Sequence, residues 1–180
     1  MTPPRSRPVR LGVAYYPEQW PEERWPVDAR LMAEAGIRVA RLAEFSWSTL
    51  EPRRGALELR WLDRAVSLLA AHGIDVVLGT PTAAPPRWLI AEQPDILPVD
   101  HEGRVFPFGH RRHYCPNNAA YHQESRRIVA ALAERYGADE RIGAWQIDNE
   151  FGERCYFFDP VTRESLLIRE AADEPIPALA

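Results

Sequence analysis

The sequence predicts an α/β protein made of about the first four β/α units of a (β/α)8 barrel. Segments with strand and helix patterns alternate along residues 11–148, and such alternation implies a parallel sheet with helical crossovers. Residues with chemically useful side chains directly follow the expected strands, where barrel enzymes place their active sites. A complete barrel takes about 250 residues. Four strands in 180 residues therefore correspond to about half a barrel.

A doubly wound sheet is the other fold that the alternation allows. That fold binds dinucleotides through a G-x-G-x-x-G turn after its first strand. Here the first strand is followed by Tyr15-Tyr16-Pro17-Glu18, which cannot cradle a pyrophosphate. The sequence therefore favours the barrel.

The first two units are expected between residues 11 and 42. The apolar run 11–16 predicts a strand that ends at Pro17. In the following helix we expect Pro26 in the first turn and Gly36 just past the end. Its apolar residues recur at four-residue intervals: Val27, Leu31 and Ala35. Residues 37–42 predict the second strand.

The helix that follows the second strand has apolar residues at i, i+3, i+4 and i+7: Leu62, Ala65, Val66 and Leu69. Gly73 closes this helix, and the β-branched run 74–78 is typical of a strand buried on both faces. Residues 80–117 follow as a long irregular stretch with seven prolines. One short helix is expected in it, at residues 87–91.

The clearest helix precedes the fourth strand, at residues 119–136. Asn117 or Asn118 can cap its beginning, and Gly137 ends it. Residues 142–148 predict the fourth strand.

All 22 positively charged residues are arginine, because the sequence contains no lysine. This excludes mechanisms that need a lysine, such as P-loop phosphate binding, Schiff-base chemistry and pyridoxal-phosphate attachment. The formal net charge is −4 and there is no basic run, so we expect no nucleic-acid partner.

The two cysteines are too few for a disulfide framework, and the N-terminus has no apolar signal region. No apolar run approaches the roughly 20 residues of a bilayer span, so we expect no membrane partner. The sequence predicts a cytoplasmic protein.

The fourth expected strand ends in the segment WQIDNEFG, residues 145–152. Side chains alternate along a strand, so Asp148 and Glu150 are expected on one face and Asn149 on the other. Near the end of the strand this alternation relaxes, and Asn149 and Glu150 can both approach the rim. Glycoside hydrolysis needs a carboxyl group that donates a proton to the leaving oxygen, and a glutamic acid in a partly apolar pocket supplies one. The neighbouring amide can bind a sugar hydroxyl. The alternative is a turn or capping cluster without chemistry, and spacing alone does not separate the two.

The chain closely resembles the N-terminal half of the glycoside hydrolase family 42 β-galactosidases. The matching segments are LGVAYYPEQWPEERW (11–25), RLAEFSWSTLEP (41–52), VVLGTPTAAPPRWL (76–89), GHRRHYCPNN (109–118) and WQIDNEFG (145–152). The resemblance implies a retaining hydrolase of terminal β-D-galactosides that requires no cofactor. It implies Glu150 as the proton donor and general acid/base, with Arg111 and Asn149 as substrate-binding residues.

Other polar and aromatic residues have competing interpretations. Glu44 can line the sugar site or form a buried ion pair with an arginine. Arg112 and His113 are expected to support their own loop. The pair Arg126-Arg127 is expected on a solvated helix face. Four tryptophans can stack on sugar rings but more often pack in a core: Trp20, Trp25, Trp47 and Trp88.

The chain departs from the family pattern in two ways. A retaining enzyme uses a second carboxylate, which the family places after strand seven, and nothing in these 180 residues matches that motif. Many relatives bind a structural zinc through four cysteines, of which Cys115 and Cys155 match two. Phe157 and Pro160 stand at the other two positions, and a closed zinc site needs four ligands. The sequence therefore argues against zinc.

We expect three regions: an N-terminal extension (1–10), the N-terminal half of the catalytic barrel (11–156) and a divergent tail (157–180). Loss of the pattern after Tyr156 resembles a truncated or frameshifted gene product, inactive by itself. The alternative is a non-catalytic carbohydrate-binding or remnant protein. A separately encoded C-terminal half, or a second copy in a homo-oligomer, could cover the open edges of the half barrel.

Overall fold

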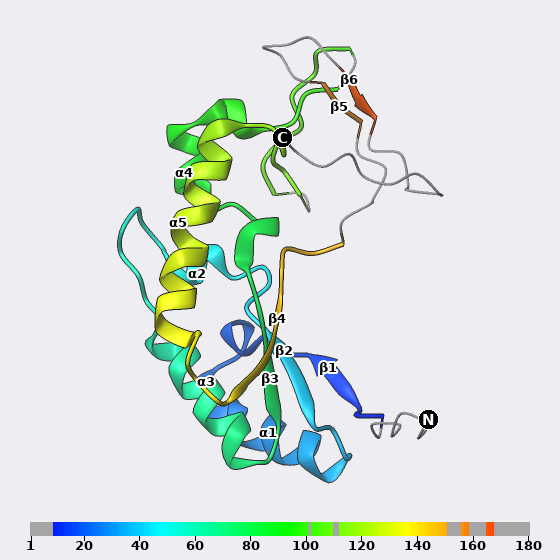
Figure 1. The fold of residues 1–180 in the computed structure, drawn as a ribbon, viewed down its shortest axis with the longest axis vertical. Coiled ribbons are helices and arrows are strands. Elements are labelled where there is room, and N and C mark those ends of the chain that lie inside the picture. Colours follow the sequence, from blue (N-terminus) through cyan, green and yellow to red (C-terminus); the bar gives the residue numbers. More distant parts are fainter. Residues whose placement is uncertain (1–8, 101, 110–111, 151–155, 159–164, 168–180) are drawn as a thin grey trace, which may run out of the picture.

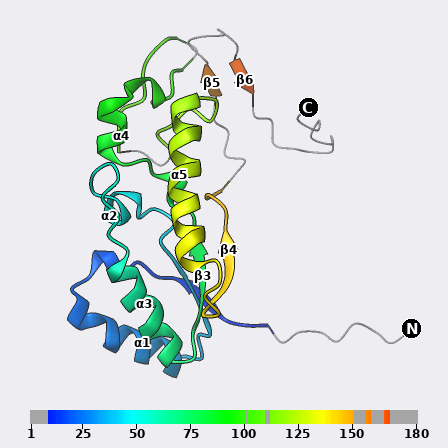
Figure 2. The ribbon, with the colours of Figure 1, turned by 60° about the vertical axis from the view of Figure 1, so that its left-hand side comes forward.

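The computed structural model describes residues 9–100, 102–109, 112–150, 156–158 and 165–167. In this part a four-stranded parallel sheet has its long helices on one side (Figures 1 and 2). The strands of this sheet are β1 (Gly12–Ala14), β2 (Val39–Leu42), β3 (Asp75–Gly79) and β4 (Ile142–Gln146). The helices are α1 (Trp25–Glu34), α2 (Trp47–Leu50), α3 (Arg60–Ala71), α4 (Arg87–Glu92) and α5 (Ala119–Tyr136). Short 3₁₀ helices cover Pro17–Gln19, Glu22–Arg24, Pro81–Ala83 and Pro94–Ile96.

The strands lie in the order β1-β2-β3-β4, and each pairs in parallel with the next strand of the chain. The register pairs Gly12 with Val39, Val39 with Asp75, and Val76 with Ile142. A doubly wound sheet instead reverses its strand order and carries helices on both faces. Sequential order with α1, α3 and α5 on one side is the winding of a barrel (Figure 2). This confirms the predicted fold class.

The main core lies between the sheet and these helices. In β2 and β3 the alternate residues Ala40, Leu42, Val76 and Leu78 are fully buried. The predicted apolar stripe of α3, Leu62, Ala65, Val66 and Leu69, packs in the same cluster with at most 1% exposure. Burying a large aliphatic side chain is worth about 1.5–3 kcal/mol, so this contact stabilises the sheet strongly.

In α1 the apolar residues that recur at four-residue intervals do not form the buried face. Val27 and Leu31 are 46% and 50% exposed, whereas Trp25 and Ala29 are buried. The indole Nε1 of Trp25 donates to the carbonyl oxygen of Pro17 at 2.9 Å, and the large ring turns its own side of the helix toward the core. A buried tryptophan removes more apolar surface from water than a valine does, so it sets the rotation of the helix.

Helix α5 has the predicted bounds. The Asn118 side chain accepts a hydrogen bond from the backbone N–H of Tyr121 at 2.9 Å, which caps the helix. Gly137 ends it with φ of −62°, outside the left-handed conformation. A Cβ there would lie 2.5 Å from the carbonyl oxygen of Ala133. Close packing of the last turn, and not a positive φ, therefore requires glycine at this position.

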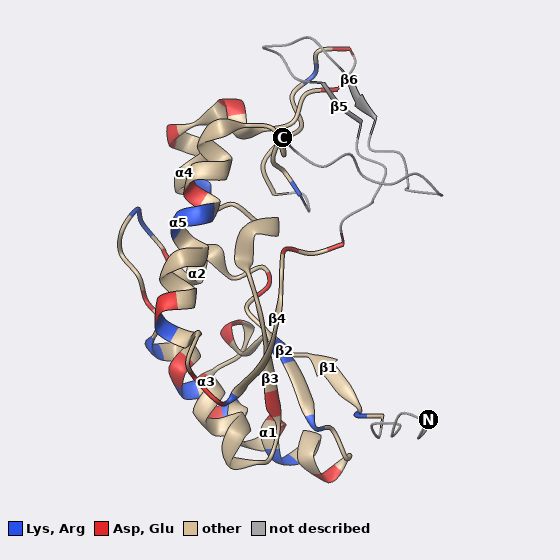
Figure 3. Cartoon of the chain, in the orientation of Figure 1, with Lys and Arg blue, Asp and Glu red and all other residues tan. Residues whose placement is uncertain are grey.

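Beyond residue 155, strands β5 (Tyr156–Phe158) and β6 (Ser165–Leu167) form an antiparallel pair. Within the described residues, no helix is both long enough and apolar enough to cross a membrane. Acidic and basic side chains are interleaved over the helices of the described chain (Figure 3).

Candidate active site at the C-terminal ends of the strands

The C-terminal ends of β2, β3 and β4 bring together Glu44, Thr80 and Asp148, which lie far apart in the sequence. Thr80 joins two of these strands: its N–H donates to the Gln146 carbonyl at 2.9 Å, and its Oγ1 accepts from the Asp148 N–H at 2.7 Å. A Cβ on Gly79 would lie 2.8 Å from both Cα and Cβ of Glu44. The glycine therefore allows the ends of β2 and β3 to approach closely.

Asp148 is 5% exposed and is held by several donors. Its Oδ2 accepts from the Thr82 hydroxyl at 2.7 Å, the Tyr114 hydroxyl at 3.2 Å and the Tyr121 hydroxyl at 3.4 Å. Arg112 lies 3.8 Å from Oδ1 as an ion-pair partner. The carboxylate is therefore satisfied inside the protein, as a buried charge must be.

The alternation of side chains does not extend to residues 148–150, beyond the end of β4. Asp148 and Asn149 are both buried and Glu150 is exposed, because the strand ends at Gln146. Asp148 and Glu150 have φ of +54° and +51°, which no strand contains. The Asn149 N–H donates to Asp148 Oδ1 at 2.6 Å, and Asn149 Oδ1 accepts from the Gln146 amide at 3.3 Å.

Glu44 forms the buried ion pair that was one of its two interpretations. Its side chain is 2% exposed and pairs with Arg41, whose Nη2 donates to Oε1 at 2.8 Å. The Tyr16 hydroxyl also donates to Oε1. Arg41 Nη1 donates to Gln146 Oε1 at 2.8 Å, which directs the Gln146 amide nitrogen toward Asn149. The ion pair therefore supports the side chain of Asn149 indirectly.

Two stacked tyrosines flank Asp148. The rings of Tyr114 and Tyr121 lie 4.2 Å apart with 14° between their planes. Burial, and then the negative charge of Asp148, raise the pKa of Tyr114 above its usual value. Burial, Tyr114 and Asp148 also raise the pKa of Tyr121. Both hydroxyls therefore keep their protons and remain donors at neutral pH.

Two of the predicted site residues, Arg111 and Cys155, lie outside the described residues, so their roles stay predictions. Cys115 is described and is buried at 6% exposure. No group of three or more metal-ligating side chains occurs in the part of the chain that the structure describes. The donor set in the sequence does not complete a closed zinc site either, since Phe157 and Pro160 carry no ligand atom.

Most of the tryptophans serve packing. Trp25 and Trp47 are buried, and Trp88 donates from its indole to the Glu51 carbonyl at 2.8 Å. Trp20 is 47% exposed, with the Arg24 guanidinium 4.3 Å above its ring. His113 supports its loop as expected, through the Pro85 carbonyl at 2.9 Å.

Arg112 and Arg127 reach further than the sequence indicated. Arg112 donates to the Glu150 carbonyl and so ties its loop to the end of β4. Arg127 is not simply solvated: its Nη2 donates to the fully buried Glu51 at 2.7 Å, and its Nε to Glu124 at 2.8 Å.

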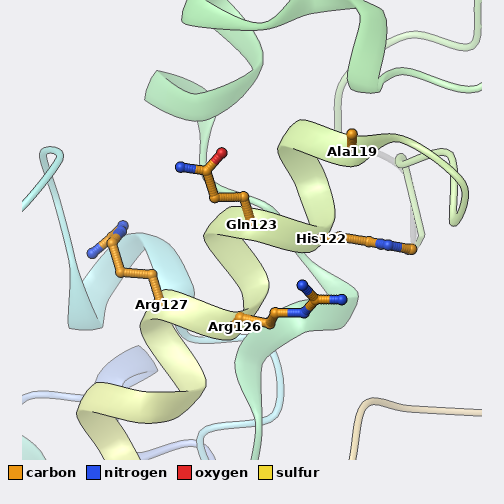
Figure 4. Close-up of a pocket in the computed structure, with 5 residues that line it drawn as sticks. All are labelled: Ala119, His122, Gln123, Arg126 and Arg127. Atoms are coloured by element: carbon orange, nitrogen blue, oxygen red, sulfur yellow. The ribbon is translucent and has the colours of Figure 1, made fainter.

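Helix α5 borders an open pocket of about 660 Å³ (Figure 4). It is lined by Ala119, His122, Gln123, Arg126 and Arg127. None of the predicted site residues that the structure describes lines it: Cys115, Asn149 and Glu150 are absent from its wall.

Sequence reasoning missed the residues that hold the site from a distance. Thr82 and Tyr121 are polar residues in ordinary surroundings, and only the fold brings them to Asp148. Two signals were available: Tyr114 lies in the matching segment 109–118, and Thr82 lies in the matching segment 76–89.

A parallel sheet wound as part of a barrel, with polar side chains after its strands, has the architecture of a barrel-enzyme domain. Comparison with known proteins agrees. The profile of glycoside hydrolase family 42, described as beta-galactosidase, matches residues 14–162. The chain belongs to this family.

Individual relatives show the same relation. A Thermus thermophilus beta-galactosidase is 57% identical over 150 residues, which cover 81% of this chain and 23% of that protein. The structure of a Halorubrum lacusprofundi beta-galactosidase superposes with a TM-score of 0.79 at 50% identity, covering 84% of this chain and 23% of the other. That of a Marinomonas beta-galactosidase gives 0.80 at 46% identity, covering 86% and 24%. The chain thus spans about a quarter of the length of these relatives.

Proposed function

We propose that this chain supplies the proton-donating side of the active site of a retaining β-galactosidase. The observation that carries the proposal is the Asn149-Glu150 pair at the end of β4, in a chain that belongs to family 42. The relatives at 57% and 50% identity are named beta-galactosidases.

In the proposed chemistry Glu150 acts twice. As an acid it protonates the glycosidic oxygen while the bond to the sugar breaks, and as a carboxylate it then takes a proton from the attacking water. A second carboxylate about 5–5.5 Å away forms and releases the glycosyl intermediate in retaining enzymes. No motif in these 180 residues corresponds to that nucleophile, so we assign it to a part of the barrel outside them.

Two residues are proposed to bind the galactose. The Asn149 amide, which the Gln146 contact orients, offers a donor and an acceptor to the 2-hydroxyl group. Arg111 offers a planar set of donors that suits paired hydroxyls. No step requires a metal or cofactor, and we place the protein in the cytoplasm.

Strands β1 and β4 are the edges of the described sheet, so their outer backbone groups have no strand partner within it. An open strand edge presents unpaired N–H and C=O groups that another strand can pair with. We propose that further β/α units pair with these edges, supplied by the rest of a barrel or by another chain.

Two measurements test the proposed function. Calorimetric titration of the chain with galactose should show binding at millimolar sugar, weakened in Asn149→Ala, because the sugar contacts do not need the nucleophile. The absence of heat would contradict galactose binding. With 2-nitrophenyl β-D-galactoside the chain alone should show no turnover. Turnover that Glu150→Gln abolishes would show instead that the chain holds both carboxylates.

A further inference from the structure

Asp148 has no part in the proposed chemistry, yet it is the centre of the polar contacts at the end of β4. Four groups converge on its carboxylate: the hydroxyls of Thr82, Tyr114 and Tyr121, and the Arg112 guanidinium. They come from three separate segments of the chain, which are the turn after β3, the loop before α5, and α5 itself.

The same residue controls the backbone that follows it. Its φ of +54° lies in the left-handed region, which is uncommon for a residue with a Cβ but which aspartate adopts when its carboxylate bonds to nearby backbone. Its N–H is fixed by Thr80 Oγ1 at 2.7 Å, and its carboxylate receives the Asn149 N–H at 2.6 Å. Its carbonyl oxygen accepts from the Gln146 amide at 2.8 Å.

Arg112 extends this control by one residue. It lies beside the carboxylate of Asp148 at 3.8 Å and donates to the backbone carbonyl of Glu150. The Arg112 side chain is only 12% exposed, so losing the negative charge beside it would leave a poorly hydrated cation.

We infer that Asp148 is a positioning residue, whose buried carboxylate fixes the backbone from which the side chains of Asn149 and Glu150 reach a galactoside. The inference rests on the proposed function. A purely structural Asp148 would affect stability alone, whereas a positioning residue also sets the affinity for the sugar.

The direct test is Asp148→Asn, which preserves size and removes the charge. One amide orientation turns the NH₂ group toward the Asn149 N–H and breaks that contact. In the other the NH₂ group donates to the hydroxyls of Thr82, Tyr114 and Tyr121, which then lose the acceptor for their own protons. In both orientations the negative charge beside Arg112 is lost. We expect the affinity for isopropyl 1-thio-β-D-galactoside, measured by calorimetry, to fall at least about tenfold.

The matched control is Asp63→Asn on α3. Asp63 also accepts from a tyrosine, Tyr136, at 2.9 Å, and pairs with Arg135 at 2.8 Å, but it belongs to the helical layer. This variant should lower stability and leave the affinity unchanged.

A gentler pair of variants applies if Asp148→Asn does not fold. Thr82→Val keeps the shape and removes the shortest hydroxyl contact to Asp148, at 2.7 Å, whereas Thr82→Ser keeps it. We expect weaker binding, by about three- to tenfold, in the valine variant and near-native affinity in the serine variant. Folded Asp148→Asn or Thr82→Val proteins with native affinity would overturn the inference.

The inference and the proposed function fail separately. If the unaltered chain binds no galactoside, the proposed function fails, and a crystal structure of Asp148→Asn then decides the positioning role. Relaxation of the Asn149 and Glu150 backbone away from the positive φ at residue 150 supports it. An unchanged backbone refutes it.

Discussion

Glu51 is a buried carboxylate whose loss should destabilise the fold by an amount that the structure predicts. Its side chain is 0% exposed. Oε1 accepts from the Gly55 N–H at 2.6 Å, and Oε2 accepts from the Trp47 indole at 3.0 Å and from Arg127 Nη2 at 2.7 Å. Both oxygens therefore face donors only.

The variant Glu51→Gln cannot satisfy this arrangement. In one amide orientation its NH₂ group faces Arg127 and the indole of Trp47, which is fully buried and has no access to water. In the other it faces the N–H of Gly55, an exposed residue, so this orientation sets the lower end of the expected cost. An unmade buried hydrogen bond costs about 1–3 kcal/mol. Loss of the charge opposite Arg127, which is 35% exposed, adds about 1 kcal/mol or less. We expect a total loss of about 1–4 kcal/mol.

Urea unfolding followed by circular dichroism measures this loss. The control is Glu34→Gln, because Glu34 and its partner Arg30 are 58% and 55% exposed. Such a pair contributes about 0.3–0.5 kcal/mol. If Glu51→Gln costs no more than Glu34→Gln, the account of this buried network is wrong.

Two further predictions concern the strand ends. Gly79→Ala should lower the free energy of unfolding by about 1–3 kcal/mol, because its Cβ would lie 2.8 Å from the Cα of Glu44. Gly143→Ala on β4 is the control and should lower it less, since its Cβ meets its nearest atom at 3.6 Å. Equal unfolding midpoints of the two variants in urea would contradict this. Burial raises the pKa of Glu18, which accepts from Ser46 at 2.6 Å. Burial disfavours the charged form of Glu18 in the folded protein. The contribution of Glu18 to stability is therefore fully present below its pKa in the unfolded chain, and it is lost as the pH rises through its higher pKa in the folded protein. Relative to the unaltered protein, Glu18→Gln should therefore be more stable at about pH 7 than at about pH 4, and the opposite trend would refute the assignment.

The alternation of elements, with glycine and proline at their ends, predicted the order of the four strands and the helices between them. It also predicted both ends of α5 as the structure has them. The rotation of α1 was not predictable from spacing alone. Trp25 lies on a different side of the helix from Val27 and Leu31, and its larger side chain is the one that is buried. A helical period identifies the buried face only where all the large apolar residues of the helix lie on the same side.

The candidate site was predictable where the residues are consecutive. Asn149 and Glu150 follow a strand, so their place at its end is visible in the sequence. Their conformation is not, since the positive φ of Asp148 depends on contacts from Thr80 and Thr82, more than sixty residues earlier. Long-range hydrogen bonds of this kind leave no local pattern.

The most direct test of the account is a ¹⁵N NMR titration of the chain with isopropyl 1-thio-β-D-galactoside. The account predicts that the largest amide shifts occur at the strand ends, at Thr80, Asn149 and Glu150, while Leu31 on α1 stays unchanged. Shifts confined to the α5 pocket, at His122 and Arg126, or no shifts at the strand ends, would contradict the assignment of the galactoside site.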